Sequence, residues 1–129
     1  MLLSNSVLRS LESRKRNLEV RQEELSREKE HCHDLIDTIE GQLSLYDEAI
    51  NNAKPNASSV SVGAVVGWYT LGYSFGGKVM TLQEAKSEKN HIAGQRARLH
   101  LDINKIETAL KHVREEQETV KKQLEREVA

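Results

Sequence analysis

The sequence has little of what a thick hydrophobic core is built from. It holds one cysteine, one proline, one tryptophan and one phenylalanine in 129 residues, and its aromatic share is only 4%. A single cysteine excludes an intramolecular disulfide framework and is typical of a reducing compartment. Because the apolar share of 37% is also low for a globular domain, we expect a thin, charge-rich helical protein.

Neither sign of charge is in excess, since 19 basic residues oppose 20 acidic ones and the net charge is −1. A dedicated nucleic-acid-binding domain carries a strong positive excess, so we expect no nucleic-acid partner. The chain opens without the basic stretch and apolar run of a secretory signal. Because this signal is absent, we predict a cytoplasmic protein.

The first predicted helix, over residues 5–53, carries two rows of residues that each recur every seven positions. Rows spaced three and four apart form one narrow stripe along a helix, the pattern typical of a coiled coil. The rows are Leu11, Leu18, Leu25, Cys32, Ile39 and Tyr46, and Leu8, Lys15, Gln22, Lys29, Ile36, Leu43 and Ile50. Pro55 disfavours helical geometry at the residue before it, which predicts the end of the helix near Ala53.

A second helix, predicted over residues 81–128, repeats this pattern in two rows of its own. They are Leu82, Lys89, Arg96, Ile103, Leu110, Gln117 and Leu124, and Ala85, Ile92, Leu99, Ile106, Val113, Val120 and Glu127. The start of this helix carries a capping-box signature. Thr81 and Glu84 stand three residues apart and can satisfy each other's free backbone donors.

Each stripe is too narrow to be buried inside a globule and needs one partner along its length. Since the two helices match in length, we expect them to pair with each other. The predicted fold is all-α, a long antiparallel two-helix coiled-coil hairpin with a tip rich in glycine and aromatic residues. It forms a single domain over residues 1–129, in which residues 54–80 are the tip and connector.

Three polar residues interrupt the first stripe. In the predicted hairpin, Lys15, Gln22 and Lys29 face the apolar stretch from Ile103 to Leu124. One interpretation is that this weak pairing leaves the terminal end loose, or completed by another protein. The other is that the polar residues only set the register of the two helices.

The middle of the chain, residues 56–77, is different in kind because it carries no charge and holds most of the glycines and aromatics. An unstructured connector of this length is uncommon in a compact unit. The alternation of Val60, Val62 and Ala64, and of aromatic residues between Tyr69 and Phe75, favours short strands in a small hairpin. A glycine-spaced helix is the alternative.

Candidate chemistry is sparse. The stretch from His31 to Asp34 has metal-ligand residue types, yet residues two apart on a helix point to different sides. Cys32 belongs to a predicted row and is expected to face the partner helix. The sequence has no nucleophile elbow, phosphate loop or dinucleotide-binding glycine motif. We therefore expect no enzyme activity, no metal site and no cofactor.

Two surfaces are candidates for partner binding, one at each end of the predicted hairpin. The first is basic and consists of Arg9, Arg14, Lys15, Arg16, Arg21, Lys121 and Lys122. It could dock on an acidic surface, or it could be an ordinary solvated face of a coiled coil.

The second surface is the apolar tip, which consists of Trp68, Tyr69, Leu71, Tyr73 and Phe75. Aromatic residues are enriched in binding hot spots, although these could equally staple the connector onto the helix ends. Insertion of residues 56–77 into a membrane is a further alternative, since 22 uncharged residues could just span a bilayer. Half of them are small or polar, so we expect no stable insertion.

Two long helices of matching length, a distinct uncharged middle and no catalytic motif resemble the central stalk of rotary-type ATPases. At this length the chain resembles the stalk family of type III secretion ATPases, of the injectisome YscO/EscO type and the flagellar FliJ type. The resemblance covers the whole chain as a pattern.

This resemblance implies a non-enzymatic cytoplasmic protein at the inner-membrane secretion apparatus. It implies that the hairpin inserts into the hexameric secretion ATPase, activates it, and links it to the export gate and to escort chaperones. It would place the basic surface near the ATPase and the apolar tip near the export gate or a chaperone. The rivals are a generic structural or adaptor coiled coil and a membrane-active hairpin.

Overall fold

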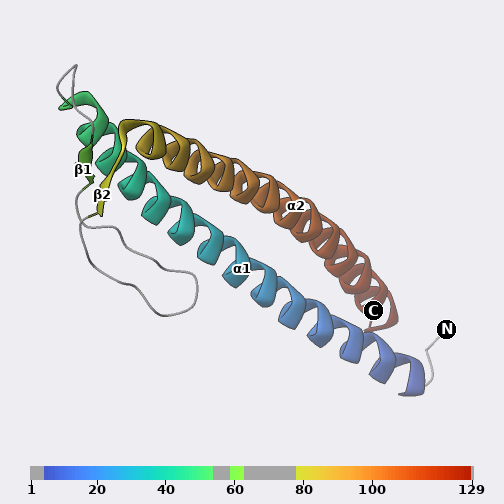
Figure 1. The fold of residues 1–129 in the computed structure, drawn as a ribbon. Coiled ribbons are helices and arrows are strands. Elements are labelled where there is room, and N and C mark those ends of the chain that lie inside the picture. The colour runs from blue at the N-terminus through green and yellow to red at the C-terminus, as the bar shows by residue number, and fades with distance from the viewer. Residues whose placement is uncertain (1–4, 54–58, 63–77, 129) are drawn as a thin grey trace. The chain divides into compact units, whose positions relative to one another are not determined.

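The computed structural model of the protein describes residues 5–53, 59–62 and 78–128 (Figure 1). Its elements are α1 (Asn5–Asn51), β1 (Val60–Val62), β2 (Lys78–Met80) and α2 (Leu82–Val128). Each helix has 47 residues, so the match in length predicted from the heptad rows is confirmed.

Contacts divide the chain into two compact units, and each contains part of both helices. Residues 1–32 and 102–129 form the terminal unit, and residues 33–101 form the central unit. In the terminal unit Arg14 contacts Glu116 and Lys29 contacts Glu107, so α1 and α2 run in opposite directions there. The predicted all-α antiparallel helical hairpin is confirmed.

The predicted rows are the residues through which the helices pack. Every row residue of α2 is buried or partly buried, and so is every row residue of α1 except Lys15. The fully buried row residues are Leu25, Ile36, Ile39, Leu43, Tyr46, Ala85, Ile92, Ile103, Leu110, Val113 and Val120. The seven-residue period therefore identifies the buried face of both helices.

The central unit has the thicker core, because a small sheet packs against its two helices. The core consists of Ile39, Leu43, Tyr46, Val60, Val62, Ala85 and Ile92. Tyr46 is only 1% exposed. Burial, with a smaller contribution from the Glu88 carboxylate, raises the pKa of its phenol.

The two strands are antiparallel, with Val60 opposite Met80 and Ser61 opposite Val79. Val60 and Val62 are buried while Ser61 between them is exposed, as the alternation in the sequence predicts. The partner strand at residues 78–80 was not predicted. The strands predicted between Tyr69 and Phe75 lie outside the described residues.

The helix ends that adjoin this sheet lie close to their predicted positions. The last residue of α1 is Asn51, two residues before the predicted end. At the start of α2, the Glu84 backbone N–H donates to the Thr81 hydroxyl at 3.1 Å, and the Ala85 N–H donates to the Thr81 carbonyl at 2.9 Å. The capping role predicted for Thr81 is therefore confirmed.

Candidate interaction surfaces

All seven residues of the predicted basic surface lie in the terminal unit and are exposed. Two of them are engaged in ion pairs. Arg14 Nη2 lies 3.4 Å from Glu116 Oε2 across the two helices, and Arg21 Nη1 lies 3.5 Å from Glu24 Oε2 on the same helix. Both pairs are about half exposed, and such pairs contribute little to stability.

The other five basic residues form no ion pair within the described part of the chain. They are Arg9, Lys15, Arg16, Lys121 and Lys122. They come from both helices, because the antiparallel arrangement brings the start of α1 beside the end of α2 in the terminal unit. The charge available to a partner therefore comes mainly from these five residues.

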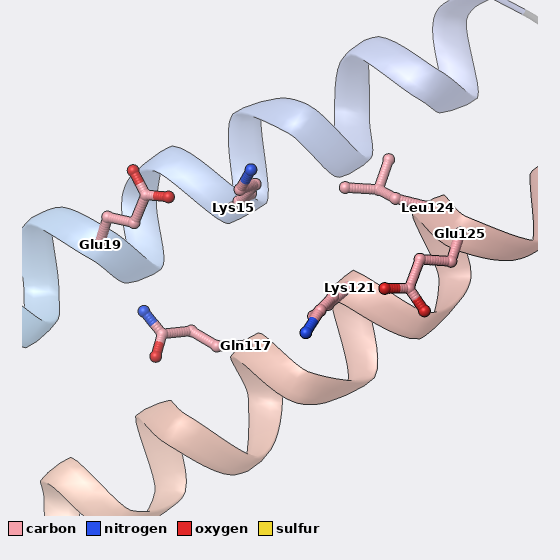
Figure 2. A pocket seen from close by; sticks show the side chains of 6 residues that line it. All are labelled: Lys15, Glu19, Gln117, Lys121, Leu124 and Glu125. Atoms are coloured by element: carbon pink, nitrogen blue, oxygen red, sulfur yellow. The ribbon is translucent and has the colours of Figure 1, made fainter. Parts of the chain in front are cut away.

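A groove of about 380 Å³ opens between α1 and α2 among these residues (Figure 2). Lys15 and Glu19 line it from α1, and Leu124 reaches toward α1 from the opposite wall. The complete lining is Lys15, Glu19, Gln117, Lys121, Leu124 and Glu125. The lining combines two lysines, two glutamates, one glutamine and one leucine, so this groove is amphipathic and carries no excess charge.

The polar row residues of α1 find partners that the sequence interpretation missed. Gln117 Nε2 donates to Gln22 Oε1 at 3.0 Å, and Lys29 Nζ lies 3.3 Å from Glu107 Oε1. Both partners lie in the stretch from Ile103 to Leu124 that was predicted to face Gln22 and Lys29, but the contacts there are polar and the pairing is not the purely apolar mismatch that was expected. Gln117 is a polar residue of a predicted row, so the sequence indicated that it faces α1. Glu107 belongs to neither row, so no such signal marked it in the sequence.

Lys15 differs from the other two polar row residues because it has no polar partner among the described residues. Its side chain lines the groove, which Gln117 and Leu124 line from the facing helix. A comparable lysine in the central unit, Lys89, forms an ion pair with Asp47 of α1. Of the three polar row residues Lys15, Gln22 and Lys29, Lys15 is therefore the one without a polar pair in the described part of the chain.

Cys32 is partly buried at its predicted row position. Burial raises the pKa of its thiol, and the Asp102 and Glu28 carboxylates raise it further, so the neutral thiol is favoured. His31 lines the same shallow groove as Cys32, Glu28 and Asp102. Within residues 5–53, 59–62 and 78–128, no group of three or more His, Cys, Asp or Glu residues could hold a metal ion.

The predicted apolar tip surface of Trp68, Tyr69, Leu71, Tyr73 and Phe75 lies outside the described residues. Of the uncharged segment 56–77, the structure describes residues 59–62, and there Val60 and Val62 pack into the central core. None of the helices in the described ranges is long and apolar enough to cross a membrane.

Comparisons with protein-family models, with curated proteins and with solved structures give no significant match to this chain.

Proposed function

We propose that this protein is a non-enzymatic central stalk of a type III secretion system that binds and activates the hexameric secretion ATPase. The observation that supports the proposal best is that exposed basic residues without ion-pair partners among the described residues lie on both helices of the terminal unit. Its antiparallel helices gather the exposed basic residues Arg9, Lys15 and Arg16 of α1 with Lys121 and Lys122 of α2. Exposed basic residues on both helices of one unit would attract an acidic partner.

A stalk of this kind can act without chemistry of its own. α1 and α2 present different side chains around the terminal unit, so each ATPase subunit would contact a different face. A ligand shifts an equilibrium only if it binds two states differently. Unequal contacts can therefore favour one nucleotide state in some subunits and another state elsewhere, whereas a uniform surface could not.

The remaining parts of the proposal concern the apolar tip and the cell compartment. The tip residues Trp68, Tyr69, Leu71, Tyr73 and Phe75 would contact an export-gate protein or an escort chaperone, because aromatic side chains are favoured anchors in binding sites. The protein would act in the cytoplasm, peripherally associated with the inner-membrane secretion apparatus.

Charge reversal at two unpaired basic positions tests the ATPase contact. We expect the Arg16→Glu/Lys122→Glu variant to need about tenfold more protein for half-maximal stimulation of the secretion ATPase, because each change replaces an attraction by a repulsion. The loss should shrink as salt is added, since exposed charges are screened. The measurement is ATP hydrolysis against stalk concentration at two ionic strengths.

The matched control is Lys86→Glu/Arg98→Glu, which reverses two exposed basic residues of the central unit. It should stimulate the ATPase as the unchanged protein does. Equal loss in both variants would show that only net charge matters. An unchanged protein that neither stimulates nor co-purifies with the ATPase would overturn the proposal and favour a generic structural coiled coil.

A further inference from the structure

The two units differ in how much of α1 they bury. Among residues 5–32 of α1, Leu25 alone is fully buried, and it packs with Leu110 and Val113 of α2. In the central unit α1 buries five residues, Ile36, Ile39, Gln42, Leu43 and Tyr46. Over all described residues, the central unit buries eight apolar residues and the terminal unit buries five, four of which belong to α2. Apolar burial is the main force that keeps two helices together, so the terminal unit is held more weakly.

Beside the apolar cluster of Leu25, Leu110 and Val113, polar contacts also cross the terminal unit between its helices. The Gln22–Gln117 hydrogen bond occupies a seam position, and the Arg14–Glu116 and Lys29–Glu107 ion pairs flank the seam. When the helices separate, water replaces each of these contacts at little net cost. If leucines stood at positions 22 and 117, separation of the helices would expose their apolar surface to water and would cost more free energy.

Three surface grooves lie along the seam of the terminal unit. One groove lies beside Lys15 and Leu124, a second beside Cys32 and Ile106, and a third beside Leu11. Their volumes are 380, 370 and 270 Å³. Each groove exposes part of a row residue that a complete seam would cover, so less apolar surface remains to be exposed on opening.

We propose that the Gln22–Gln117 layer is a built-in opening point, at which the terminal unit separates its two helices while the central unit stays closed. This inference goes beyond the proposed function and does not depend on an ATPase. Regions with few buried apolar contacts open at lower free energy than the whole molecule. Helix segments released from their partner also lose helicity, because isolated helices are marginal in water.

Amide hydrogen exchange of the full chain, followed by mass spectrometry, tests the opening. We expect backbone amides at residues 18–30 and 108–120 to exchange at least about tenfold faster than those at residues 36–46 and 85–95. Residues 18–30, 36–46 and 108–120 lie inside the helices, whereas residues 85–95 begin in the first turn of α2, so fraying there would work against the expected difference. Equal exchange rates in the two units would overturn the proposal.

The role of the glutamine layer is tested by replacing both partners. The Gln22→Leu/Gln117→Leu variant should slow exchange in the terminal unit at least about tenfold and leave the central unit unchanged, because an apolar layer resists opening. Either single replacement leaves one amide against leucine and should not reproduce the slowing. A double variant that exchanges like the unchanged protein contradicts the role of this layer.

Asn17→Leu is the matched control for helix propensity, because Asn17 is exposed on α1 and leucine is the better helix former. It should leave terminal-unit exchange nearly unchanged. If Asn17→Leu slows exchange as much as the double variant does, helix propensity explains the effect and the proposal fails.

Discussion

An Ile39→Ala variant is expected to lose about 2–5 kcal/mol of unfolding free energy, because it removes buried methyl groups and leaves a cavity. Ile39 is 0% exposed and lies in the core with Tyr46, Val60 and Val62. Neighbouring side chains held by both helices and the sheet cannot close the gap easily. Urea unfolding followed by circular dichroism measures the loss.

Leu101→Ala is the control for this prediction, since it truncates an aliphatic residue that is 61% exposed in the same unit. Its unfolding free energy should change by less than about 0.5 kcal/mol. Equal losses in the two variants would mean that the heptad rows do not form the core of the central unit.

A Val120→Asp variant is expected to destabilise the terminal unit by up to about 3–5 kcal/mol, because it places an unpaired carboxylate in the seam. Val120 is 0% exposed. The carboxylate can return to water only if the two helices of the unit separate. Terminal-unit amides should therefore exchange quickly, while protection in the central unit persists.

Val20→Asp makes the same chemical change in the same unit, at a position that is 54% exposed. It should alter exchange in the terminal unit by less than about threefold, since an exposed carboxylate keeps its hydration. Similar disruption by the two variants would show that Val120 does not lie in a closed seam.

The sequence predicted the helical hairpin well because one physical period governs both helices. Leu25 and Ile92 belong to rows whose members stand seven positions apart. Burial of one narrow stripe along a helix requires this spacing. The cap at Thr81 was predictable for a similar reason, since the contact spans only three residues. Local contacts and regular periods can be identified without knowing the tertiary arrangement.

The broader packing of the central unit was not predictable from the heptad rows. Gln42 lies outside both rows yet is buried, and Leu45 is partly buried against the core. A sheet that packs beside the helices adds a second contact face, and the period of α1 carries no information about it. Alternating aromatic residues between Tyr69 and Phe75 predicted strands in that stretch and not at residues 78–80. The β2 strand was therefore missed.

The polar partners across the seam were missed because a seven-residue period leaves the register open by whole heptads. Gln22 and Gln117 were both recognised as row residues, but the period alone could not place one opposite the other. The ion pair of Arg14 with Glu116 depends on that same register. The ion pairs of Arg14 and Arg21 leave the predicted basic surface with less available charge than the sequence indicates, and its role in binding stays a prediction.

The central claim is that α1 and α2 pair with each other inside one molecule. Isotope-filtered nuclear Overhauser spectroscopy tests it directly, using methyl contacts of Leu25 with Leu110 and Val113. The account predicts these contacts in uniformly labelled protein and no intermolecular counterpart in a mixture of labelled and unlabelled chains. Contacts that appear only between different chains would contradict it.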